Sequence, residues 1–212
     1  MNEPQPRAHL LRYEPAVHGG PDYALLAGLG LTPSRVVDFS ASTNPYGPSP
    51  RVFEALAQVA VDRYPDSRSL VLVERLAARH KVQPEQVLVG NGSTELIRLL
   101  ALAYLDAGDL CLIAGPTYGE YRAAATLAAA RVEEVQAPEE DGFAPDVAAL
   151  AAQLRSSRPR LTFLCNPNNP TGSYLGGEAV AYLAEACADG LLVVDQAYRP
   201  FVAEPWPAEP LL

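Results

Sequence analysis

The sequence predicts an α/β protein with a mainly parallel sheet covered by helices on both faces. Short apolar segments alternate with longer segments whose apolar residues recur at helical spacing. Apolar strands that alternate with helices are typical of a parallel sheet in a three-layer fold. With 212 residues and 49% hydrophobic side chains, the chain can bury a substantial core.

The first part of the chain is expected to be an N-terminal arm, residues 1–50. Its stretches "HGGPDY" and "DFSASTNPYGPSP" are too rich in turn-forming residues for a core helix. Residues 51–212 are expected to form a partial large domain, which begins with helices at 51–62 and 70–80. In the first of these helices Val52, Leu56 and Val59 share one face.

Strands and helices then follow in alternation. The strands are expected at residues 86–90, 110–115, 131–136, 161–165 and 191–195, with helices at 95–108, 118–130, 145–154 and 177–190. In open α/β sheets, ligands bind beyond the carboxyl ends of the strands. Functional residues are therefore sought in the four loops at that edge.

Composition excludes several classes of protein. The formal net charge of −9 and the dispersed basic residues disfavour a nucleic-acid partner. No stretch is long and apolar enough to span a bilayer and no signal-peptide core is visible, so we expect a cytoplasmic protein with no membrane partner. The three cysteines are far apart in apolar segments, which favours reduced core residues over disulfides or a metal site.

The first loop, "VGNGSTE" at residues 89–95, joins an expected strand to a helix. Gly92 permits a tight turn, and free backbone N–H groups near Ser93 and Thr94 would face the strand end. Such a helix terminus binds anions, phosphate above all. For this loop taken alone, an ordinary helix cap with Gly-Asn-Gly as its turn is the favoured explanation.

Two further loops carry side chains that could contact a ligand at this edge. In "GPTYGEY", Tyr118 can lay its ring against such a ligand, although a half-buried core aromatic is the alternative. "CNPNNPTG" at residues 165–172 is more specific, because two prolines fix the backbone and Asn168 and Asn169 offer amides at a strand end.

The fourth loop begins at Asp195, which follows the apolar residues "LLVV". Its carboxylate is expected at the carboxyl edge of the strand, partly shielded from water. A shielded charge needs a cationic or hydrogen-bonding partner. A cap for the following element is the alternative.

The ordered set "GNGSTE", "PTYGEY", "NPNNPTG" and "DQAY" resembles the pyridoxal-phosphate enzymes of aminotransferase class I/II, the fold-type I group, over about residues 12–201. Within this group, "HGG" followed by "DFSASTNPYGPSP" and "RYPD" looks most like threonine-phosphate decarboxylase of cobalamin biosynthesis. Histidinol-phosphate aminotransferase of histidine biosynthesis is the neighbouring alternative.

The resemblance implies a set of cofactor-binding residues. Three would hold the phosphate of pyridoxal 5′-phosphate on the helix terminus: Gly92, Ser93 and Thr94. Four would contact its ring or ring substituents, by stacking (Tyr118), by bonding to the phenolic oxygen (Asn169 and Tyr198) or by pairing with the pyridine nitrogen (Asp195).

Residues of the arm and of the turn after it are assigned by the same resemblance. Tyr64 of "RYPD" would reach the cofactor phosphate of the other subunit in a homodimer, although a tyrosine packed on the arm needs no dimer. His18 and Asn44 would line the pocket of a small phosphorylated amino-acid or amine substrate. A solvated imidazole is the alternative for His18.

The sequence departs from the family most clearly in its lysines. These enzymes carry the cofactor as a Schiff base on a lysine downstream of the Asp-x-Ala-Tyr motif, whereas the only lysine here is Lys81, far upstream. Ser42 and Gln196 also replace an asparagine and an acid that the family usually has. We therefore expect no catalytic residue in this chain, which looks truncated before the lysine and inactive by itself.

Two other functions remain open. A non-catalytic relic that binds pyridoxal phosphate without covalent chemistry would explain the missing lysine. A nucleotide-binding α/β protein ranks last, because the sequence has neither a Walker lysine after the glycines of "GNGSTE" nor the Rossmann spacing. In the sheet of the resembled family, two strands from further along the sequence lie between those at 86–90 and 161–165. Neither is found in these residues, so the strand at 161–165 is expected to present an unpaired edge.

Overall fold

The computed structural model describes residues 4–207, which divide into two compact units. One unit comprises the residues up to 16 together with those from 71 onward, and the other comprises residues 17–70. This division differs from an arm that ends at residue 50, and the expected arm and partial large domain stay predictions.

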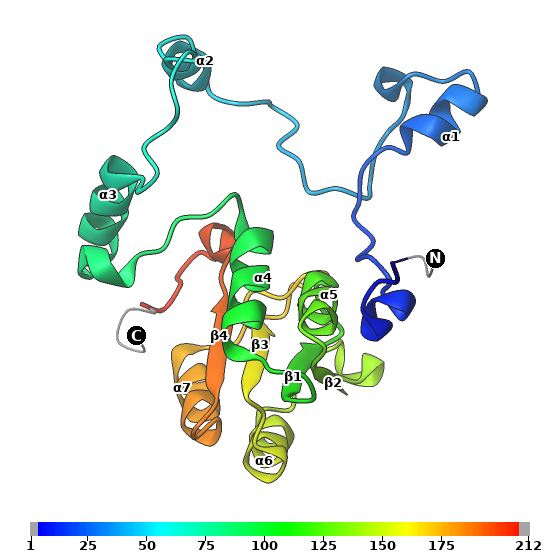
Figure 1. Ribbon diagram of the computed structural model, residues 1–212, viewed down its shortest axis with the longest axis vertical. Helices are drawn as coiled ribbons and strands as arrows, with labels where there is room; N and C mark the ends of the chain where they lie inside the picture. The colour runs from blue at the N-terminus through cyan, green and yellow to red at the C-terminus, as the bar shows by residue number, and fades with distance from the viewer. Residues whose placement is uncertain (1–3, 208–212) are drawn as a thin grey trace. The chain divides into compact units, whose positions relative to one another are not determined.

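The larger unit is built on a four-stranded parallel sheet (Figure 1). Its strands are β1 (Leu110–Gly115), β2 (Arg131–Gln136), β3 (Leu161–Cys165) and β4 (Leu191–Asp195), arranged in the order β2-β1-β3-β4. All four have the bounds that the sequence predicts. Each connection between successive strands contains a helix, as is usual between parallel strands.

Helices cover both faces of this sheet and confirm the three-layer prediction. On one face lie α4 (Ser93–Tyr104) and α5 (Glu120–Leu127), and on the other lie α6 (Val147–Ser157) and α7 (Gly177–Ala186) (Figure 1). Because successive strand residues point to opposite faces, Ile113 and Phe163 pack under α4 and α5, while Leu112 and Leu164 pack under α6 and α7. These two apolar clusters fix the position of the strands and so of the loops that follow their carboxyl ends.

One predicted strand is absent and one predicted edge is wrong. Residues 87–90 follow the 3₁₀ helix η3 (Pro84–Gln86) without forming a strand, and the Leu88 side chain is 68% exposed. A strand needs a neighbour to complete its hydrogen bonds, and none of the described strands pairs with this segment. β3 is not an edge strand, because it pairs with both β1 and β4; the edges of the described sheet are β2 and β4.

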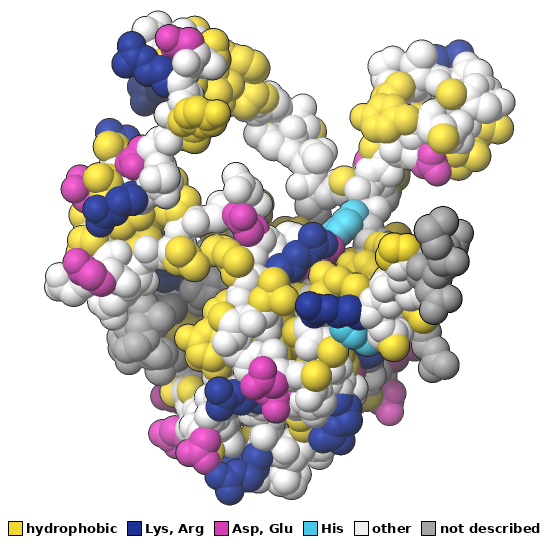
Figure 2. Space-filling view, viewed as in Figure 1, with side chains coloured by type: hydrophobic (Ala, Val, Ile, Leu, Met, Phe, Trp, Pro, Cys, Tyr) yellow, Lys and Arg dark blue, Asp and Glu magenta, His cyan; other side chains and the backbone are white. Residues whose placement is uncertain are grey.

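The smaller unit contains α1 (Tyr23–Gly28), the 3₁₀ helix η2 (Pro33–Arg35) and α2 (Pro50–Leu56). The helix predicted at 51–62 ends early, since a short helix depends on packing and Val59 and Val61 stay exposed. Many apolar side chains of this unit are exposed, and Figure 2 shows them over both α1 and α2.

The remaining elements belong to the larger unit. They are the 3₁₀ helices η1 (Ala8–Arg12), η4 (Glu139–Asp141) and η5 (Arg199–Phe201), and the helix α3 (Leu70–His80), which begins at the boundary between the units. The predicted helix at 70–80 is therefore confirmed. Within the described residues, none of the helices has the length and apolar character that crossing a membrane requires.

The cysteines lie where the sequence predicts. Cys111, Cys165 and Cys187 are all buried and unbridged. Burial raises the pKa of each thiol, that of Cys111 to about 12. At neutral pH these side chains therefore stay protonated.

Candidate functional site

The candidate site lies where β1, β3 and β4 reach the carboxyl edge of the sheet, beside the N-terminus of α4. A cavity of about 170 Å³ opens there. Five of its lining residues are predicted site residues, Ser93, Tyr118, Asn169, Asp195 and Tyr198, and three are not, Tyr121, Cys165 and Ala197. Parallel strands bring these loops together because all of their carboxyl ends face the same way.

The α4 terminus is open to an anion. Gly92 is the residue before its first turn and has a φ of 81°, which a residue with a side chain adopts only with strain. The first N–H groups of any α-helix, here those of Ser93 and Thr94, have no intrahelical acceptor, and Gly92 provides no side-chain cap for them. Glu95 instead accepts bonds from the backbone and side-chain nitrogens of Asn91 and stabilises the turn.

Tyr118 is held between this terminus and the core. Its Oη lies 3.1 Å from Thr94 Oγ1, and its ring meets the ring of Tyr121 edge-on, with centroids 5.7 Å apart. The side chain is half-buried, so one part of the ring contacts protein while another lines the cavity. Its position suits stacking against a planar ligand.

The loop after β3 is fastened to the loop after β1 through Asn168. The Asn168 amide nitrogen donates to Pro116 O and to Thr171 Oγ1, both at 2.8 Å, while Thr117 Oγ1 donates to Asn168 Oδ1 at 2.6 Å. A further pair of bonds joins Asn166 to Leu175. This network leaves the neighbouring Asn169 facing the cavity.

Asp195 ends β4 beside Cys165 of β3, and the backbone N–H of Asn166 donates to its carbonyl at 2.8 Å. Its two carboxylate oxygens have different donors. Oδ1 accepts from the Ala197 N–H and Oδ2 accepts from the Tyr121 hydroxyl, both at 2.9 Å. The carboxylate is thereby oriented at the cavity wall.

Tyr121 and Cys165 were missed by the sequence reasoning. Tyr121 stands in the quoted motif "GPTYGEY", but Tyr118 precedes α5, so helical spacing could not relate the two side chains. Cys165 lies opposite Asp195 only because of the register between two strands, which the sequence of neither strand reveals. Ala197 contributes through its backbone.

Three predicted residues belong to the smaller unit, which is described by itself. Asn44 donates to Gly47 O and accepts from the Tyr46 N–H, so its amide stabilises a local turn. Tyr64 is fully exposed, and His18 is exposed as well. Their roles toward cofactor, substrate or a second subunit stay predictions. Lys81 follows α3 and does not line the cavity.

Similar proteins were found in three comparisons. Residues 34–211 match the family model "Aminotransferase class I and II". A histidinol-phosphate aminotransferase of Moorella thermoacetica is 38% identical over 209 residues, which are 96% of this chain and 52% of that protein. The chain thus spans about half the length of the curated relatives it matches.

Two solved structures are similar as well. A histidinol-phosphate aminotransferase from Sinorhizobium meliloti in complex with pyridoxal-5′-phosphate has a TM-score of 0.71 and 28% identity, over 80% of this chain and 47% of that one. An L-threonine-O-3-phosphate decarboxylase from Porphyromonas gingivalis has a TM-score of 0.59 and 30% identity, over 73% and 45%.

Proposed function

Because the chain belongs to the aminotransferase class I and II family, whose cofactor is pyridoxal 5′-phosphate, we propose that the cavity at the carboxyl edge of the sheet binds this cofactor. The observation that carries the proposal is the set of groups gathered there. An anion-binding helix terminus, an aromatic ring, an amide and a carboxylate line one cavity.

These groups fit the parts of the cofactor. The N–H groups of Ser93 and Thr94, after Gly92, would hold its phosphate. The Tyr118 ring would stack on the pyridine ring, and Asp195 would pair with the protonated ring nitrogen.

Two more cavity residues, Asn169 and Tyr198, would donate to the phenolic oxygen of the cofactor. When bound, pyridoxal phosphate supplies an electron-withdrawing ring that stabilises negative charge on the substrate carbon. Asp195 favours that chemistry by keeping the ring nitrogen protonated, and Tyr118 restricts the ring to one plane.

For the reaction, we propose amino-group transfer with histidinol phosphate as the amine donor. The Moorella thermoacetica relative and one from Symbiobacterium thermophilum are both named histidinol-phosphate aminotransferase, and they are 38% and 36% identical over 96% and 97% of this chain. The decarboxylase expected from the "HGG" arm is similar as a solved structure, with a lower TM-score than the aminotransferase structure. The comparisons thus support the alternative reading of the sequence over its first one.

Threonine-phosphate decarboxylation is the second candidate. It rests on the 30% identity to the Porphyromonas gingivalis enzyme and on the order of "HGG" and "DFSASTNPYGPSP" in residues 17–70. In both candidates the substrate carries a phosphate, and His18 and Asn44 are the residues proposed to meet it. A homodimer in which Tyr64 reaches the cofactor phosphate of the other subunit is part of the same proposal.

The lysine question defines a third candidate. Lys81 is the only lysine of the 212 residues, and it does not line the cavity. Without a nearby amine these residues would hold the cofactor by non-covalent contacts alone. A protein restricted to them would bind pyridoxal phosphate and turn over nothing.

One experiment separates the three candidates. The protein is isolated from its native cells and incubated with pyridoxal phosphate. One sample is reduced with borohydride and its intact mass is measured, and a second, unreduced sample is assayed with each substrate. Glutamate formed from histidinol phosphate and 2-oxoglutarate supports the aminotransferase. Carbon dioxide released from threonine phosphate supports the decarboxylase. Cofactor binding with neither reaction and no reduced adduct supports the third candidate, and absence of binding rejects the proposal.

A further inference from the structure

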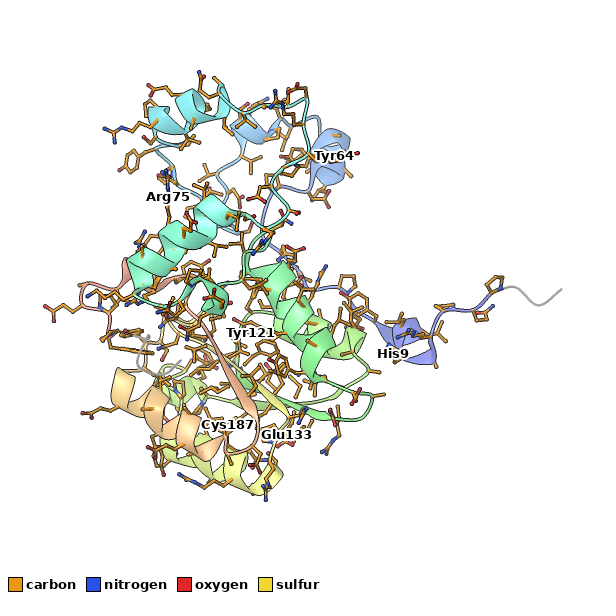
Figure 3. The ribbon with its side chains drawn as sticks, turned by 60° about the vertical axis from the view of Figure 1, so that its left-hand side comes forward. His9, Tyr64, Arg75, Tyr121, Glu133 and Cys187 are labelled. Carbon is orange, nitrogen blue, oxygen red and sulfur yellow. The ribbon has the colours of Figure 1, made fainter. Side chains whose placement is uncertain are left out.

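Tyr121 stands out among the residues around the cavity because nothing in the proposed function uses it. Its side chain is completely buried in the apolar cluster between α4, α5 and the sheet (Figure 3). The ring stacks on Phe163 of β3 with centroids 4.8 Å apart and planes 9° from parallel. The ring of Tyr118 meets it edge-on.

A phenol in such a place must find a partner for its hydroxyl, and the partner found is Asp195. Burial, with Cys165 and Asp195 close by, raises the pKa of Tyr121 far above its usual value. The hydroxyl therefore keeps its proton at any working pH. It acts as a donor to the carboxylate and not as an acceptor.

The bond completes the support of the Asp195 carboxylate. Oδ1 accepts from the Ala197 N–H within the same loop, and Oδ2 accepts from the hydroxyl of Tyr121 on α5. Two donors on different oxygens restrict rotation about the last side-chain bond. Each oxygen keeps a lone pair for a ligand.

On the premise of the proposed function, we propose that Tyr121 is a positioning residue for the cofactor ring nitrogen. Its hydroxyl fixes the orientation of the Asp195 carboxylate, and the stack on Phe163 fixes the hydroxyl. Bonds of this kind to a charged group are worth more than neutral ones, because the charged form would otherwise be poorly solvated.

The test compares two ligands in one protein. Pyridoxal phosphate has the ring nitrogen, and its deaza analogue has a C–H group there and cannot pair with Asp195. Tyr121→Phe keeps the ring and its stack but removes the hydroxyl. We expect it to weaken pyridoxal phosphate roughly tenfold in an absorbance titration and to leave the affinity for the analogue almost unchanged.

Two controls separate positioning from general packing. Tyr182→Phe removes a hydroxyl that bonds to Arg155 on α6, outside the cavity, and it should change neither affinity. Asp195→Asn should weaken pyridoxal phosphate, and adding Tyr121→Phe to it should cause little further loss, because both changes act on one pairing. Independent losses in the double variant would overturn the proposal.

The other outcomes are also decisive. Equal weakening of both ligands by Tyr121→Phe would assign Tyr121 a packing role only. If that variant does not fold, Phe163→Leu provides a second route, because it loosens the stack and leaves the hydroxyl in place. A selective, smaller loss of pyridoxal phosphate is then expected, and equal losses would reject the idea. A wild-type protein that binds neither ligand would instead reject the proposed function.

Discussion

Replacing Asn168 by alanine tests whether the site loops are held by the network that joins them. The side chain makes three hydrogen bonds. Those with Pro116 and Thr117 join the loop after β3 to the loop after β1, and the one with Thr171 lies within the loop after β3. At roughly 1 kcal/mol net for each bond, Asn168→Ala should lower the free energy of unfolding by about 3 kcal/mol. Water can reach these half-buried groups, which makes the figure an upper estimate.

Urea unfolding followed by tryptophan fluorescence suits this measurement. The chain has one tryptophan, Trp206, whose Nε1 donates to Leu175 O next to the same loop, so its signal reports the larger unit. Thr117→Val removes only one bond and should cost about 1 kcal/mol. The double variant should cost less than the sum, because the two side chains share that bond. A loss below about 0.5 kcal/mol for Asn168→Ala would refute the network, since changes at unconnected surface positions have that size.

Three further changes follow from other contacts. Arg98→Ala removes the 3.0 Å ion pair with the buried Glu120 and should lower the free energy of unfolding by about 2 kcal/mol. Arg158→Ala removes an exposed ion pair with Asp189 and should lower it by under about 0.5 kcal/mol. Equal shifts of the melting temperature in the two variants would contradict this. In Gly92→Ala the added Cβ contacts no atom, but the alanine must adopt a φ of 81°. The free energy of unfolding in urea should fall by about 1 kcal/mol and phosphate should bind more weakly. Unchanged values would show that the turn relaxes. Burial raises the pKa of the Cys111 thiol from 9.0 to about 12, so this thiol loses its proton at a lower pH in the unfolded chain than in the folded one. The free energy of unfolding should therefore fall as the pH rises above about 9. The fall should be less steep in Cys111→Ala.

Much of the fold could be predicted from the sequence because its signals are local. Three of the described strands, β1, β3 and β4, are mainly apolar runs, whereas β2 is the mixed segment "RVEEVQ"; the bounds of all four match the structure to the residue. Ser93, Tyr118 and Asp195 could be expected at one site, because the carboxyl ends of parallel strands meet at one edge. That rule needs only the order of the elements.

The errors concern non-local properties. Residues 87–90 have the composition of a strand, but a strand exists only with a neighbour to pair with. Residues 57–62 carry helical spacing without a surface to bury Val59 or Val61. The bond from Tyr121 to Asp195 joins residues 74 positions apart and depends on how α5 lies on the sheet. None of these arrangements is encoded in a short stretch of sequence.

Among the described strands β4 pairs only with β3, and this pairing also restricts how the protein can vary. Since side chains alternate between the two faces of a strand, sliding β4 by one position would present Val194 or Gln196 where Asp195 now stands opposite Cys165. The turn from α7 into β4, residues 187–190, sets that alignment. Substitutions there should be tolerated where they keep its length. An insertion or deletion of a single residue would remove the carboxylate from the cavity without touching any residue that lines it.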